Sequence, residues 1–184
     1  MPSLTTEQMT EQLTTLATGV YDAFARFELL DETDRVPSTP LVSTLMQHAD
    51  AAKELSRTAV HLAAVVGIPD PDSVVDRETD SKVRARLANV AEHTLRAVDL
   101  FTRTAETSAS PTSAPGSSGA QRREGRMVVD HASARAELRR AAEATGETIT
   151  LLKEHAELRR LLASMLRRPT ATPLPPQPRP RRTR

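Results

Sequence analysis

Apolar residues recur every three or four positions along most of this chain, and that spacing places them on one face of an α-helix. In residues 5–30 the repeat passes through Met9, Leu13, Leu16, Val20, Phe24, Phe27 and Leu30. In residues 40–66 steps of four and three alternate without a break, at Leu41, Leu45, His48, Ala52, Leu55, Ala59, Leu62 and Val66. The pattern predicts two amphipathic helices whose period is typical of helices that cross at a shallow angle in a bundle.

The same repeat predicts two more helices. Residues 80–107 carry it at Val83, Leu87, Val90, Thr94, Ala97 and Phe101. Ser73 and Asp76 have capping-box spacing, so a short helical turn over residues 73–77 is the alternative start of this helix. Residues 130–168 carry the repeat at Leu138, Ala142, Thr145, Ile149, Leu152 and Ala156. Gly146 is a weak point inside the last helix, because glycine is a poor helix former.

Local signals mark where these helices begin and end. Thr5 and Gln8 have the spacing of a capping box, and Thr39 precedes Pro40, a residue that suits the first turn of a helix. Gly67 supplies a stop for the second helix. Residues 108–129 are rich in Ser, Pro, Gly and Ala and predict a flexible linker, and residues 169–184, with six prolines and four arginines, predict a disordered tail.

The predicted fold class is all-α. Apolar residues make up 38% of the 184 residues and only four residues are aromatic, a composition that suits packed helices better than sheets. Residues 1–107 form a three-helix core in this prediction, and residues 130–168 return along it after the linker to complete an up-down four-helix bundle. In the alternative, the fourth helix stands apart as a docking or dimerising arm.

Charge is distributed unevenly along the chain, although the net charge is only +1. Residues 1–110 hold ten basic and seventeen acidic residues, whereas residues 111–184 hold fifteen basic and seven acidic residues. In an up-down bundle, the acidic loops near Glu28 and Asp70 would face the arginines at the two ends of the fourth helix. The asymmetry therefore indicates either neutralisation within the molecule or binding of a partner.

The end of the fourth helix is the strongest candidate interaction site. Its apolar residues share one side of the helix, and these are Leu158, Leu161, Leu162, Met165 and Leu166. The opposite side is basic and carries Arg159, Arg160, Arg167 and Arg168. A basic amphipathic end of this kind suits a second copy of the chain, a groove on another protein or an anionic membrane surface. A partner helix is favoured, because the segment has none of the Trp or Phe typical of membrane-bound helices.

The predicted tail adds Arg179, Arg181, Arg182 and Arg184 to this basic region. Pro173 to Pro176 match the P-x-x-P spacing that aromatic grooves accept. Arginines can instead hold phosphates without reading sequence, so accessory nucleic-acid binding is the second hypothesis. The chain has no zinc-finger spacing and no aromatic platform for stacking bases.

Catalytic chemistry has little support in the sequence. None of the five histidines has the Glu-x-x-His spacing of a di-iron bundle, and His48, on the apolar stripe, is interpreted as a hydrogen-bonded or edge-of-core residue and not as a ligand. Glu28, Asp31 and Glu32 would be magnesium ligands in a metal-dependent nucleotide hydrolase, which is the third hypothesis. That site needs a second acidic pair, and Asp50, Glu54 and Glu92 lack the matching spacing. Phosphate-binding glycine motifs are missing too, so we expect neither catalysis nor a cofactor or metal.

The chain contains no cysteine, so disulfides and thiolate metal sites are excluded. Its first residues have neither a basic flank nor an apolar run, and nothing approaches the ~20 apolar residues that span a membrane. These features predict a soluble, cytoplasmic protein.

Overall fold

The structure, a computed structural model, describes residues 6–26, 28–30, 36, 41–66, 74–110 and 117–166. It contains the helices α1 (Thr6–Arg26), α2 (Val42–Val65), α3 (Val74–Ala109) and α4 (Ser118–Leu166). Within these ranges no residue belongs to a β-strand. The predicted all-α, four-helix fold is therefore confirmed.

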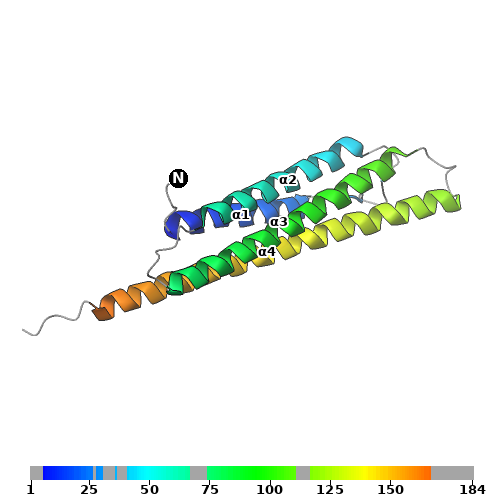
Figure 1. Cartoon of the computed structure of the whole chain (residues 1–184). Helices are drawn as coiled ribbons and strands as arrows, with labels where there is room; N and C mark the ends of the chain where they lie inside the picture. The colour runs from blue at the N-terminus through cyan, green and yellow to red at the C-terminus, as the bar shows by residue number, and fades with distance from the viewer. Residues whose placement is uncertain are drawn as a thin grey trace, which may run out of the picture.

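The four helices run alternately up and down, as Figure 1 shows. Each packs on two neighbours: α2 on α1 and α3, and α4 on α3 and α1, with the α2–α3 and α3–α4 contacts the most extensive. Helix α4 thus closes the bundle and does not stand apart as an arm. The predicted caps at Thr5, Thr39 and Pro40 and the stop at Gly67 lie outside the described residues.

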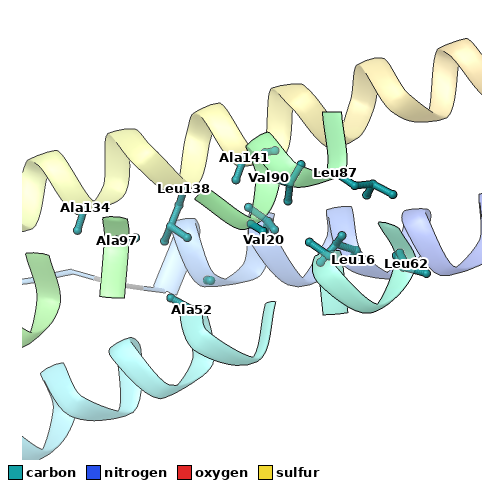
Figure 2. Close-up of a cluster of buried hydrophobic side chains, with 14 of the residues drawn as sticks. Leu16, Val20, Ala52, Leu62, Leu87, Val90, Ala97, Ala134, Leu138 and Ala141 are labelled. Carbon is teal, nitrogen blue, oxygen red and sulfur yellow. The ribbon is translucent and has the colours of Figure 1, made fainter. Parts of the chain in front are cut away.

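The core follows the predicted stripes closely. In Figure 2 apolar side chains from all four helices converge between the ribbons, with those of Leu138 and Ala141 near Val20 and Val90. Alanines such as Ala52, fully buried, let the helix backbones approach one another. Gly19 serves the same purpose between α1 and α2, because a Cβ there would lie 3.0 Å from Leu55 Cδ2.

Threonines occupy several fully or nearly fully buried positions. Each satisfies its hydroxyl locally: Thr94 Oγ1 donates to the carbonyl oxygen of Val90 at 2.9 Å, and Thr145 Oγ1 to that of Ala141 at 2.7 Å. Thr104 and Thr148 bond the carbonyl four residues earlier in the same way. A buried hydroxyl costs little once it is hydrogen-bonded, so Thr94 and Thr145 can occupy positions on the apolar stripe.

Two helix ends differ from the prediction. Helix α1 ends at Arg26 and not at residue 30. In its last turn the Arg26 guanidinium pairs with the Asp22 carboxylate at 2.9 Å. Leu29 is buried from a non-helical segment, whereas Leu30 is exposed. Helix α3 begins at Val74, six residues before the predicted start. Its first turns are anchored because Arg84 donates two hydrogen bonds, of 3.0 and 2.6 Å, to the Val66 carbonyl at the end of α2.

The predicted linker over residues 108–129 is helical for most of its length, because α4 begins at Ser118. The Ser117 hydroxyl accepts a hydrogen bond from the Ala120 amide at 3.2 Å, as an N-cap does. Arg123 donates to the Ser108 carbonyl at 3.1 Å, and Met127 is buried in the core. These contacts outweigh the poor helix propensity of the glycines in the segment.

Helix α4 runs unbroken through Gly146, and a Cβ added there would meet nothing within 4 Å. We therefore expect Gly146→Ala to raise the free energy of unfolding by about 0.5–1 kcal/mol, because alanine loses less backbone entropy in a helix. Urea denaturation measures this change. Gly19→Ala is the matched control, because its new methyl group would press on Leu55. A larger increase in the free energy of unfolding from Gly19→Ala than from Gly146→Ala would contradict this account.

Candidate functional site

The α4 end surface, which we define as Leu158, Arg159, Arg160, Leu161, Leu162 and Met165, is exposed. The exposed fractions of its apolar side chains are 44% for Leu158, 62% for Leu161, 47% for Leu162 and 72% for Met165. Both arginines are exposed beside them. The other large apolar residues that the described chain exposes are far apart in sequence: Tyr21, Leu30, Met46, Val60, Leu95 and Val129.

The length of α4 explains this exposure. Its 49 residues span about 74 Å, whereas the 36 residues of α3 span about 54 Å. A hydrogen bond of 3.2 Å between Thr79 Oγ1 and His155 Nδ1 joins the start of α3 to α4, just before Leu158. Figure 1 shows the final turns of α4 extending past the near ends of the other three helices. Among the described helices, none therefore covers the apolar side chains on these turns, which remain largely exposed.

Part of the predicted interaction site falls outside the described residues. Side chains of α4 are described as far as Met165. Beyond that limit lie the side chain of Leu166 and the residues Arg167, Arg168, Arg179, Arg181, Arg182 and Arg184.

A groove of about 650 Å³ adjoins the α4 end surface between α1 and α4. Glu7 and Glu11 line it from α1, and Leu152 and Ala156 of α4 contribute apolar lining. Arg160 belongs both to this groove and to the α4 end surface. Acidic and basic side chains therefore both lie beside the exposed apolar side of α4.

No known protein family, curated protein or solved structure matches this chain.

The acidic candidates form no metal site in the part of the chain that the structure describes. Glu28 is exposed there, and Asp31 and Glu32 lie outside the described residues. Glu54 pairs with Arg57 at 3.0 Å, and Glu92 pairs with Arg96. Among described side chains, no group of three or more His, Asp or Glu residues is placed to hold a metal ion. No helix of the described chain is long and apolar enough to cross a membrane.

The predicted meeting of opposite charges at the bundle ends finds limited support among the described ion pairs. Glu78, an acid at the end where α4 finishes, pairs with Lys82 of its own helix at 2.7 Å. Arg123, at the opposite end, donates to a backbone carbonyl. One acid–base contact between helices involves Arg86 and Glu147, at 3.9 Å near the middle of α4.

Two buried histidines flank the ring of Phe101. His48 of α2 and His131 of α4 each lie 5.6 Å from the Phe101 ring centroid in edge-to-face geometry. Burial lowers the pKa of His48. For His131, burial first, then the neighbouring His48 and Arg135, lowers the pKa to about 4. His48 is 9% exposed, so it lies deeper than most edge-of-core residues, and both rings are neutral near pH 7.

Two polar features of α4 were not evident in the sequence. His131 is only 4% exposed, and His93 Nδ1 lies 2.6 Å from Glu137 Oε2, in a contact between α3 and α4. His131 lies four residues after Met127 and seven before Leu138, a spacing that continues the apolar stripe. That spacing was the signal from which the burial of His131 could have been predicted. The contact between His93 and Glu137 depends on which faces of α3 and α4 pack together. The apolar period of each helix does not determine that pairing.

Proposed function

We propose that this chain is a non-catalytic helical-bundle protein that associates with another helix through the α4 end surface. That helix belongs to a second copy of the chain or to another protein. The observation that carries the proposal is the gathering of four exposed apolar side chains within eight residues at the projecting end of α4. Contiguous apolar surface of this kind marks interaction sites, whereas single exposed apolar residues do not.

The energetics favour a partner that contributes apolar surface of its own. Covering a half-exposed Leu or Met contributes about 1 kcal/mol, so the four side chains supply roughly 4 kcal/mol. Association costs at least about 4 kcal/mol in lost translational and rotational freedom. A flat polar partner therefore would not bind measurably. A second amphipathic helix doubles the apolar contribution to roughly 8 kcal/mol, which leaves about 4 kcal/mol after that cost and corresponds to a complex of about millimolar affinity.

The spacing of the apolar residues suits a helical partner. Leu158, Leu162 and Met165 are separated by four and three residues, which is the spacing of a coiled-coil seam. Exposed Glu154 and Glu157 precede the arginines on the same helix. Two α4 ends that met in antiparallel orientation would set acidic residues near basic ones, so the surface has the self-complementary charge that a symmetric dimer requires.

Sedimentation equilibrium tests the proposal with a matched pair of variants. The first replaces Leu158, Leu161, Leu162 and Met165 with Ser, and the control replaces the scattered residues Met46, Val60, Leu95 and Val129 with Ser. We expect the native chain and the control to gain mass as the protein concentration approaches about 1 mM, and the first variant to stay monomeric.

If the native chain is monomeric throughout, affinity capture from the native host decides between a protein partner and no partner. A protein retained by the native chain and the control but not by the first variant supports the proposal. Equal retention by all three, or no retention, contradicts it.

Accessory nucleic-acid binding is the alternative, and the exposed Arg159 and Arg160 favour it. Fluorescence anisotropy with single-stranded and duplex oligonucleotides at low and high salt tests it. Binding that weakens with salt and with the double substitution Arg159→Gln and Arg160→Gln is the result that this alternative predicts. Absence of binding at low salt rules it out.

A further inference from the structure

A second site lies far from the α4 end surface, at a cavity of about 260 Å³ beside the start of α4. Its lining comes from the segment after α1 and from one face of α4, and the residues are Glu28, Leu29, Leu30, Val128, His131, Ala132 and Arg135. His131 and Leu158 are 27 positions apart on α4, or about 40 Å. The cavity is therefore independent of the proposed association.

Two lining residues have buried nitrogen atoms that lack a partner. His131 Nε2 and Arg135 Nε are both shielded from solvent and make no hydrogen bond in the structure. The two residues are four positions apart on α4, so they are neighbours on one helix face. A buried polar atom without a partner costs about 1–3 kcal/mol, so a ligand whose acceptors reached these nitrogens after a small movement of the two side chains would recover that energy.

From these observations we propose that the cavity binds a small monocarboxylate with a short apolar body. The carboxylate oxygens would accept hydrogen bonds from Arg135 and from the neutral His131 ring, and Leu29, Leu30 and Val128 would pack around the apolar part. Arginine suits this role because its guanidinium fits a planar carboxylate. The Arg135 guanidinium is held in place because it stacks 4.9 Å above the ring of Phe24.

Glu28 restricts the class of ligand. Glu28 is one of the residues that line the same cavity, so with His131 neutral the lining residues carry one positive and one negative charge. A second negative charge on the ligand would meet Glu28 without a further cation to offset it. The site therefore favours monocarboxylates over phosphate or dicarboxylates.

Isovalerate serves as the probe, and isothermal titration calorimetry with NMR of the histidine side chains serves as the readout. We expect isovalerate to bind and to shift the His131 resonances, and the neutral amide isovaleramide to bind at least about tenfold more weakly. Arg135→Gln should weaken isovalerate binding by a similar factor. Arg139→Gln is the matched control, because Arg139 stacks on the same Phe24 ring, at 5.4 Å, but does not line the cavity.

Glu28→Gln distinguishes binding from damage to the fold, since it should tighten isovalerate binding severalfold by removing the repulsive charge. Circular dichroism checks that each variant is folded. The proposal is overturned if isovalerate leaves the His131 resonances unchanged, if the amide binds as well as the acid, or if Glu28→Gln weakens binding. None of these results bears on association through α4, which the serine variants test separately.

Discussion

Phe101→Ala is expected to lower the free energy of unfolding by about 4 kcal/mol. Phe101 is completely buried, and it is the largest of the fully buried side chains in the described part of the chain. Its ring fills the space between α2 and α4 and contacts the imidazoles of His48 and His131 edge-on. Removal of the ring leaves a cavity that three helix backbones cannot close, and it also removes two aromatic contacts.

Urea denaturation followed by far-UV circular dichroism measures this loss. Phe101→Leu keeps most of the volume and should cost less than half as much. Tyr21→Ala is the exposed control and should change stability by no more than about 0.5 kcal/mol. Equal effects of the substitutions at residues 101 and 21 would show that this end of the bundle is not packed as described.

Acidification is expected to destabilise the fold between about pH 6.5 and pH 4. The folded pKa of His131 is about 4, whereas the unfolded ring titrates near 6.5. Across that interval the unfolded chain binds the proton more readily than the folded chain, so the free energy of unfolding falls as pH falls. The difference in pKa corresponds to about 3 kcal/mol lost by the time pH 4 is reached. The lowered pKa of His48 acts in the same direction.

Urea denaturation at a series of pH values measures this dependence. His131→Phe keeps a ring of similar size beside Phe101 and removes the titrating group. The variant should therefore show a clearly flatter profile over the same interval. Equal slopes for the native chain and the variant would mean that His131 is solvated in the folded protein.

The apolar period predicted most of the architecture because each helix buries one stripe. On α3, every predicted stripe residue from Val83 to Phe101 is buried. Helix ends were harder to predict. Ser117 sits among Ser, Gly and Pro residues that are typical of a linker, yet α4 begins at Ser118, and the tertiary contacts of Arg123 and Met127 support its first turns. At α1 the reverse occurs: the period predicted Leu30 on the apolar stripe, but the helix ends at Arg26, and Leu29 reaches the core from non-helical backbone while Leu30 is exposed.

For the candidate site, the sequence predicted the amphipathic character of the α4 end, but its exposure depends on where α3 begins. The early start of α3 at Val74 covers more of α4 than expected and still leaves Leu158 to Met165 in solvent. The cavity beside His131 could not have been predicted. It depends on the segment of residues 28–30 folding back against α4, a contact between segments about 100 positions apart that helical periodicity does not predict.

Hydrogen–deuterium exchange of residues 155–166 tests most directly whether another molecule covers the end of α4. We predict that these amides exchange more slowly as protein concentration rises, or when extract of the native host is added. Amides of residues 134–149, which the bundle itself buries, should exchange at an unchanged rate. Identical exchange of residues 155–166 under all of these conditions would contradict the proposal that this surface binds a partner.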